Sequence, residues 1–423
     1  MRELRVLHVI GGGDSGGAMT HLLPLLSALG SAGCDARLLC LGGGTLAEEA
    51  SRRGSVVAVL PMAHAWDASI VGPLGRVVSG GPVDLEVLQR EDAGIAEMTP
   101  KLERLRRPNA VQSLPRPRWD VIHTHGMRAN LPVRLVVKKR RRAPCLFTTV
   151  HSDLRRDYTS PRLACLYQAL DRATLPTVDT VVCVSDALRT LLLERGYPAD
   201  RLITIRSGLE SLGGPAGRTS SSSGSPGGRG RGTRQRIGTI ARLVSVKDID
   251  LLLDVAFLLH DTHPDVEFVV VGDGPQAAML ERRSRTLGLG ERVQFVGRKE
   301  DVAAQLAGWD AYLVTSAFEG GVSMAVLEAM AATVPVVTTA AGGVEEAVAD
   351  GETGFVVSRN QPRGAIAKAL AGRAALLLDD PELRARMGAA AERRVRGRFA
   401  IERTASATRR AYERCLAAKG ALL

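Results

Sequence analysis

The strongest constraint on the fold is an alternation of short apolar runs with helical stretches along the first half of the chain. Residues 4–10 predict a strand from their Val, Ile and Leu content, and residues 18–29 predict a helix whose leucines line one stripe. Further strands are predicted at 37–41, 56–60, 120–125, 146–151, 180–185 and 202–205. Such an alternation predicts a parallel sheet with helices on both faces.

A segment rich in Gly, Ser and Arg interrupts this pattern. Residues 213–235, GGPAGRTSSSSGSPGGRGRGTRQ, cannot bury a core, so they predict a linker. As a flexible coil this linker would span about 26 Å. The alternation then restarts, with strands predicted at 237–241, 266–271, 293–296, 311–315, 334–338 and 354–357, and helices at about 248–260, 275–287, 300–307, 323–332 and 361–376.

Together these segments predict an α/β protein of two doubly wound, Rossmann-like domains that face a cleft. The N-terminal domain spans residues 1–212 and contains a variable insertion at 62–118, where periodicity is weak. The C-terminal domain spans 236–400, and 401–423 predict a C-terminal helix that returns to the first domain. Ligands of doubly wound sheets bind beyond the carboxyl ends of the strands, so we expect the site there.

Composition excludes several other classes of protein. Apolar residues make up 45% of the chain and charged residues 24%, which is typical of a globular protein. No run of about 18 apolar residues predicts a transmembrane helix. The opening sequence MRELRVLHVIGGG predicts a strand and not a secretion signal. Six scattered cysteines without a Cys-x-x-Cys pair argue against a zinc cluster or disulfide scaffold and fit a reducing cytoplasm.

The net charge of +11 is concentrated in the first half and the linker. A basic first half suits an anionic partner, and the stretches Arg104–Arg118 and Lys138–Arg142 are candidates for contact with an anionic membrane. A solvated basic surface explains the same charge. Nucleic acid is not expected as a partner, because few aromatic residues interleave with the basic ones and no recognition module is visible.

Glycines after the first predicted strand match a dinucleotide-binding pattern. Gly11, Gly13 and Gly16 fit G-x-G-x-x-G, but the pattern also needs an acid at the end of the second strand, and Asp35 comes too early. An NAD enzyme is therefore disfavoured. Gly16 and Gly17 instead favour close approach of the backbone to a phosphate or sugar, with a plain turn as the alternative.

Histidines follow or end two of the predicted strands. His151 stands at the carboxyl end of its strand, where it could donate a hydrogen bond to a sugar hydroxyl, take part in proton transfer or simply make a structural hydrogen bond. In HTHG, we expect one of His123 and His125 to point into the core and the other into the cleft. No carboxylates accompany them, so no metal site is predicted.

Charged residues cluster at two junctions of the second domain. Arg242 and Lys247 follow its first strand and predict an anion clamp, although solvent-exposed charge is the alternative. In SAFEGGVSMAVLEAMA, Glu319 stands at a helix mouth, next to glycine amides suited to a diphosphate or sugar. Glu328 lies in an apolar helix segment, where a carboxylate is costly unless it is paired. A ribose hydroxyl pair is one candidate partner, and a surface position is the alternative.

The order of these motifs resembles the family 4 glycosyltransferases, which are retaining enzymes with the GT-B architecture. The resemblance covers nearly the whole chain except 62–118 and the linker. It rests on ordered landmarks, namely GGAMTHL, HTHGMRANL, TTVHS, VSDALRTLL, ARLVSVKD, VVVGDGP, VQFVGR and EGGVSMAVLEAMA. Two features depart from the family pattern. Eight residues, not seven, separate Glu319 from Glu328, and residues 205–210 read IRSGLE in place of the usual Asn-Gly-Val/Ile-Asp.

The resemblance implies a role for each matching residue. Catalytic roles fall to His151 near the donor sugar, to Glu319 as the first acid of the Glu-x7-Glu motif, and to Arg242 and Lys247, which neutralise the diphosphate. Glu328 would bind the ribose. The donor-binding set implied for this chain is Gly16, Gly17, Arg242, Lys247, Gly274, Glu319, Gly320, Gly321, Val322 and Glu328.

The implied activity is transfer of a sugar from a nucleotide-diphosphate sugar to a hydroxyl of a glycan, lipid-linked or small-molecule acceptor, with retained configuration. The first domain would take the acceptor and the second the donor. Neither a metal nor another cofactor is expected. We expect a cytoplasmic protein of glycan biosynthesis, peripheral at the inner face of the membrane. An inert nucleotide-sugar-binding protein and a sugar-nucleotide epimerase are the alternatives.

Overall fold

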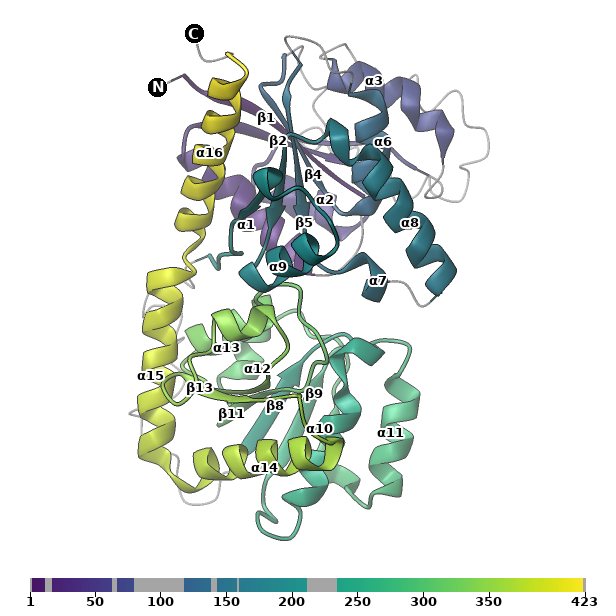
Figure 1. The fold of residues 1–423 in the computed structure, drawn as a ribbon. Helices are drawn as coiled ribbons and strands as arrows, with labels where there is room; N and C mark the ends of the chain where they lie inside the picture. Colours follow the sequence, from purple (N-terminus) through teal and green to yellow (C-terminus); the bar gives the residue numbers. More distant parts are fainter. Residues whose placement is uncertain are drawn as a thin grey trace. The chain divides into compact units, whose positions relative to one another are not determined.

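The computed structural model describes residues 2–11, 17–62, 67–79, 118–137, 143–157, 160–210 and 234–420. They form two compact units, an N-terminal unit of residues 1–208 and 401–423 and a C-terminal unit of residues 209–400 (Figure 1). Each unit is a parallel sheet with helices, so the predicted pair of doubly wound domains is confirmed. Almost all of the predicted linker and most of the predicted insertion at 62–118 lie outside the described residues.

The N-terminal unit is built on a seven-stranded parallel sheet in the order β3-β2-β1-β4-β5-β6-β7. Its strands are β1 Leu4–Ile10, β2 Cys34–Cys40, β3 Val57–Val59, β4 Val121–His125, β5 Cys145–Val150, β6 Thr180–Cys183 and β7 Leu202–Thr204. Its helices include α1 Gly17–Ser31, α2 Thr45–Arg52, α3 Val71–Val78, α6 Met127–Val136, α7 Leu154–Asp157, α8 Pro161–Thr174, α9 Asp186–Glu194 and α16 Ile401–Ala418.

The C-terminal unit repeats this plan with a six-stranded parallel sheet in the order β10-β9-β8-β11-β12-β13. Its strands are β8 Arg236–Ile240, β9 Glu267–Val271, β10 Val293–Phe295, β11 Ala311–Val314, β12 Val336–Thr339 and β13 Gly354–Val357. Its helices include α10 Ile249–Leu258, α11 Ala277–Thr286, α12 Val302–Leu306, α13 Met324–Ala331, α14 Arg363–Asp379 and α15 Pro381–Arg398.

Strand β9 shows why these segments fold as central strands. Phe268 and Val270 join the core on one face of the sheet, while Val269 and Val271 join the core on the other. All five residues of the strand are buried. A strand covered on both faces needs a continuous apolar run, and that is the pattern from which the sequence predicted it.

The C-terminal helix α16 belongs to the N-terminal unit, as predicted, and packs beside α1 (Figure 1). Tyr412 on this helix is fully buried, with its ring edge-on to Phe147 at 4.9 Å between centroids. The Tyr412 hydroxyl shares a 2.6 Å hydrogen bond with His123 Nδ1. The last helix of the chain therefore completes the core behind the first sheet.

Helix α15 is the main element missing from the sequence prediction. Its start carries two recognisable signals, since Asp380 accepts a 2.8 Å hydrogen bond from the Leu383 amide and Pro381 occupies the first helical position. Among the described residues, no helix has both the length and the apolar character needed to cross a membrane.

We predict that Tyr412→Ala destabilises the N-terminal unit by about 3–5 kcal/mol, because it empties buried space and leaves a buried histidine nitrogen without its partner. Arg410→Ala, at an exposed position of the same helix, is the control and should change stability by less than about 0.5 kcal/mol. Urea unfolding followed by hydrogen–deuterium exchange measures the stability of each unit separately. Equal protection of β4 and β5 in both variants would contradict the packing role of α16.

Candidate functional site

The carboxyl edge of the C-terminal sheet gathers most of the predicted donor-binding residues. From β8 the chain runs outward to β9 and β10 and then returns to β11 on the other side of β8. This reversal leaves a crevice between the loops after β8 and β11, where doubly wound folds bind their ligands. Lys247 follows β8 and Glu319 follows β11, so the two predicted residues stand across this switch point.

Lys247 and Glu319 form the best-defined pair at this edge. Lys247 Nζ donates a 2.6 Å hydrogen bond to Glu319 Oε1, and Ser316 Oγ donates to the same oxygen at 2.6 Å. The Glu319 backbone is held on both sides, by Ala341 O at 2.6 Å and by the Gly343 amide at 2.9 Å. The eight-residue spacing to Glu328 therefore still leaves Glu319 beside the predicted cation.

Arg242 is held near this edge by a glycine loop. Gly272 has φ +135°, and a Cβ there would lie 1.9 Å from Ala241 O. A Cβ at Gly274 would lie 2.5 Å from Leu243 O. Only glycine permits this approach, so the loop after β9 supports the segment that carries Arg242. The Arg242 side chain itself is exposed and has no hydrogen-bond or ion-pair partner among the described residues.

The start of α13 supplies backbone amides to the same edge. Gly320 and Gly321 precede it, and Val322 is only 5% exposed. A Cβ at Gly343 would lie 2.4 Å from the Gly321 carbonyl carbon, so the two glycine loops pack closely. The N-cap Ser323 makes no side-chain cap. The first amides of α13 are thus not used by a side-chain cap, as an anion-binding helix end requires.

Glu328, the second predicted acid, is a half-buried carboxylate on α13. No hydrogen bond or ion pair reaches its side chain from the described residues. Burial raises the pKa of Glu328 to about 7, because desolvation disfavours the charged form. A partly desolvated acid without a protein partner is suited to accept hydrogen bonds from a ligand.

The N-terminal unit carries its own cavity, of about 290 Å³, at the carboxyl edge of its sheet. The sheet order reverses between β1 and β4, and the loops after β1, β4 and β5 form the wall. His151 lines it, together with ion-paired Arg195 and Asp153. Asp171 also lines it and is paired with Arg134 at 2.7 Å.

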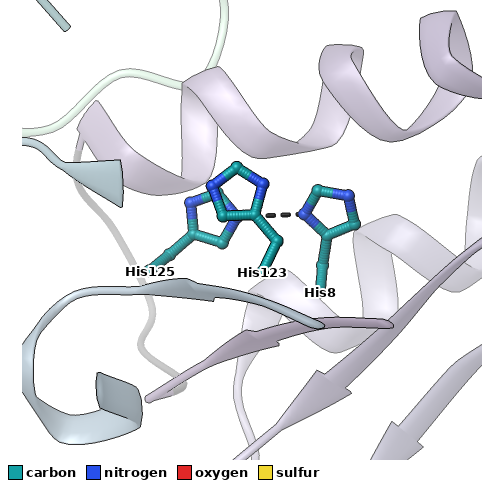
Figure 2. A group of neighbouring side chains, drawn as sticks. All are labelled: His8, His123 and His125. Atoms are coloured by element: carbon teal, nitrogen blue, oxygen red, sulfur yellow. Dashed lines mark hydrogen bonds between the residues drawn. The ribbon is translucent and has the colours of Figure 1, made fainter. Parts of the chain in front are cut away.

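A cluster of buried histidines adjoins this cavity, and one of them, His125, lines it. His123 and His125 point to the same side of β4, with stacked rings 4.6 Å apart between centroids (Figure 2). Both are buried, at 1% and 2% exposure. His125 lines the cavity, whereas His123 bonds Tyr412 and Thr149 in the core. The expectation that one points to the core and the other to the cleft therefore agrees with the structure, although both residues share one face of the strand. His8, the register partner of His123 on β1, completes the group.

This cluster is one of two groups of metal-ligand type among the described residues of the N-terminal unit, the other being Cys145, Asp179 and Cys415. One ring nitrogen each of His8, His123 and His125 lies within 4.8 Å of the others, and no Asp or Glu joins them. However, both nitrogens of His123 are engaged, with Tyr412 at 2.6 Å and Thr149 at 2.7 Å. His8 Nδ1 and His125 Nε2 share a 3.0 Å hydrogen bond. The ring nitrogens that face one another are engaged in these bonds, and only His8 Nε2 of this cluster has no partner among the described residues, so we assign no metal here.

The structure brings the sequence-predicted residues together in two sets. Glu319, Lys247, Arg242 and the glycines at 274, 320 and 321 gather at the C-terminal sheet edge, and His151 lines the N-terminal cavity. Gly17 begins α1, and Gly16 lies outside the described residues. Sequence reasoning missed the cavity residues Asn130, Asp153, Asp171 and Arg195, and His8 of the neighbouring histidine cluster. The two-residue period of HTH could have indicated the histidine cluster, whereas the others carry no local motif.

Two family models match the chain. "Glycosyl transferase 4-like domain" matches residues 16–208, and "Glycosyl transferases group 1" matches residues 228–394. Between them they cover most of the chain and both of its units.

Curated relatives give shorter matches. The chain is 34% identical over 151 residues to N-acetyl-alpha-D-glucosaminyl L-malate synthase of Bacillus anthracis, covering 36% of this chain and 38% of that protein. It is 34% identical over 169 residues to a GDP-mannose-dependent phosphatidylinositol monomannoside mannosyltransferase of Mycolicibacterium smegmatis, covering 38% and 43%. The chain thus spans less than half the length of either relative.

Solved structures match nearly the whole chain. Anabaena HepE in complex with UDP-glucose superposes with a TM-score of 0.72 at 18% identity, covering 97% of this chain and 100% of that one. Sucrose-phosphate synthase of Thermosynechococcus elongatus superposes with a TM-score of 0.68 at 18% identity, covering 98% and 100%. At these identities the likeness shows the fold. With both family models matched in order, the chain belongs to the family 4 glycosyltransferases of GT-B fold.

Proposed function

We propose that this protein transfers a sugar, with retained configuration, from a nucleotide-diphosphate sugar to a hydroxyl of a glycan, lipid-linked or small-molecule acceptor. The observation that carries the proposal is the Lys247–Glu319 pair at the switch point of the C-terminal sheet, with Arg242 nearby on the same loop. The relatives' names agree with it, since one uses GDP-mannose and a structural neighbour holds UDP-glucose.

In this proposal the C-terminal unit stabilises the leaving diphosphate. Breaking the bond between sugar and phosphate leaves negative charge on the phosphate oxygens. Arg242, Lys247 and the α13 amides are fixed donors for that charge, and each well-placed donor is worth ~3–4 kcal/mol of transition-state stabilisation. Glu319 would turn from Lys247 toward hydroxyls of the donor sugar, and Glu328 would accept hydrogen bonds from the ribose. The leaving phosphate would help to take the acceptor proton, so no protein nucleophile is required.

The N-terminal cavity is proposed as the acceptor site. His151 and Asn130 on its wall can bond sugar hydroxyls. We further propose that the protein works in the cytoplasm, at the inner face of the membrane; of the basic stretches invoked for that contact, only Arg118 lies within the described residues. The two alternatives, an inert binder and an epimerase, differ in their products. Transfer of sugar in a single turnover excludes the inert binder. A donor that stays unchanged when it is incubated with the protein without any acceptor excludes the epimerase.

Removal of the proposed clamp tests the function directly. Arg242→Ala should lower kcat about 10²–10³-fold while changing the acceptor KM little, because the charge it meets develops in the transition state. Arg282→Ala removes an exposed arginine of α11 in the same unit and should leave kcat unchanged. Steady-state kinetics with a screen of UDP-, GDP- and ADP-sugars provide the measurement, and an unaltered rate in Arg242→Ala would refute the clamp.

The raised pKa of Glu328 predicts a pH dependence of nucleotide binding. Ribose hydroxyls favour the ionised carboxylate, so affinity for UDP or GDP should rise about tenfold from pH 6 to pH 8 relative to Glu328→Gln. Titration of both variants with the same nucleotide cancels the ionisation of the phosphate. Parallel binding curves for the two proteins would place Glu328 away from the ribose.

The same shift acts on stability with a defined sign. A carboxyl whose pKa is higher in the folded state than in the unfolded one loses stabilisation as pH rises from about 4.5 to 7. Glu328→Gln should therefore be more stable than the wild type at pH 8 and equally stable at pH 4. This comparison needs no ligand and checks the burial of Glu328 independently of its role.

Metal independence is a further proposal, because Arg242 and Lys247 would supply positive charge to the diphosphate. The Asp-x-Asp match at Asp248 and Asp250 is ion-paired with arginines. Transfer should proceed at the full rate after treatment with EDTA. Addition of Mg²⁺ or Mn²⁺ should not raise it. Loss of activity that Mn²⁺ restores would overturn this proposal.

A further inference from the structure

A chain of three imidazoles runs from the core of the N-terminal unit to its cavity. His8 Nδ1 and His125 Nε2 share a hydrogen bond of 3.0 Å, the dashed line in Figure 2. His125 Nδ1 and His151 Nε2 share the next, at 3.3 Å. His151 then lines the cavity. Its Nδ1 has no protein partner among the described residues, so this is the nitrogen left for a ligand.

All three rings are uncharged at neutral pH. Burial and the neighbouring histidines lower the pKa of His8 and of His151 to about 3. The same causes lower the pKa of His125 well below its usual value. A neutral imidazole carries one N–H, and its other nitrogen is an acceptor. The three rings therefore share three protons among six nitrogens.

The two hydrogen bonds between the three imidazoles fix which nitrogens carry these protons. If His8 donates from Nδ1, then His125 accepts at Nε2, carries its proton on Nδ1 and donates to His151 Nε2. The proton of His151 must then lie on Nδ1, facing the cavity. If the direction is reversed, His151 donates from Nε2, its Nδ1 becomes a bare acceptor and the proton of His8 lies on Nε2. Only these two arrangements keep both hydrogen bonds.

The His8 end of the imidazole series distinguishes between the two arrangements. His8 Nε2 is buried and has no hydrogen-bond partner among the described residues. The reversed arrangement would bury an N–H group there without an acceptor, which is the rarer defect in proteins, whereas an unpaired lone pair is tolerated more often. We infer that His8 and His125 are positioning residues that hold His151 in its Nδ1–H tautomer, so that His151 presents a hydrogen-bond donor to the cavity.

This arrangement restricts what His151 can do. A protonated Nδ1 donates to a hydroxyl, ring or phosphate oxygen of a ligand but cannot remove a proton from an acceptor hydroxyl. His151 is then not the general base at that nitrogen. This consequence for catalysis rests on the proposed function, whereas the tautomer itself does not depend on it.

Imidazole ¹⁵N chemical shifts test the tautomer without any substrate. The chain contains only eight histidines, so ¹⁵N-histidine labelling and long-range ¹H–¹⁵N correlation give a spectrum that single substitutions can assign. We expect protonated Nδ1 and bare Nε2 on His8, His125 and His151 of the intact protein. A protonated Nε2 on His151 overturns the inference. The inference also fails if Zn²⁺, added at equimolar concentration, binds the histidines and breaks the two hydrogen bonds between them.

Two substitutions of His8 test its positioning role. His8→Leu removes the donor, so the His151 tautomers should mix and kcat/KM should fall about tenfold, the effect of one misdirected hydrogen bond. His8→Asn places an amide N–H close to the position of Nδ1 and should restore both tautomer and rate. His263→Gln, in the C-terminal unit, is the control and should change neither. An unchanged His151 tautomer in His8→Leu overturns the positioning role.

The readouts separate this inference from the proposed function. If the wild type shows the expected tautomer but transfers no sugar from any donor, the function is wrong and the tautomer stands. If transfer is observed and His151 carries its proton on Nε2, the function stands and the inference fails. Should His8→Leu not fold, the wild-type spectrum and His8→Asn still decide the question.

Discussion

Both units depend on one geometric constraint: all strands of a sheet are parallel, so every loop that follows a strand emerges at the same edge. Where the strand order reverses, the loops of two neighbouring strands diverge and leave a crevice. In the C-terminal unit this brings Lys247 within 2.6 Å of Glu319, 72 residues away. In the N-terminal unit the pairing of β1 with β4 brings His8 to His125, 117 residues away. Each set of polar contacts is a consequence of topology and not of local sequence.

That constraint explains which features were predictable. Buried parallel strands are short apolar runs, so β1 and β13 were predicted to the residue. Lys247 and Glu319 could be assigned to one edge because each follows a strand. The ion pairs of Arg195 with Asp153 and of Arg134 with Asp171 could not, because their partners lie on different helices and loops with no motif. The division of His123 to the core and His125 to the cavity was predicted, whereas their common face follows from the two-residue period of a strand.

The two sheet edges differ in charge. At the C-terminal edge, Lys247 is neutralised by Glu319 while Arg242 is exposed and unpaired among the described residues. An incoming diphosphate would therefore meet one free guanidinium and one ammonium that exchanges a carboxylate for a phosphate. Exchange of one anionic partner for another costs little desolvation, since the lysine is already partly withdrawn from water. The charges at this edge therefore favour binding of an anion.

The N-terminal cavity is lined by neutral histidines and by paired charges, with the exposed Arg128 also on its wall. Histidines beneath and beside it have pKa values lowered by burial, so they remain uncharged, and Arg195 on its wall is already paired with Asp153. Neutral imidazoles held by one another offer directed hydrogen bonds without the charge that would attract phosphate. Sugar hydroxyls are the chemistry that such a wall distinguishes best, because an unmatched buried donor or acceptor is costly. The cations at one edge and the neutral histidines on the wall of the other cavity are therefore the physical basis on which we propose donor and acceptor sites in different units.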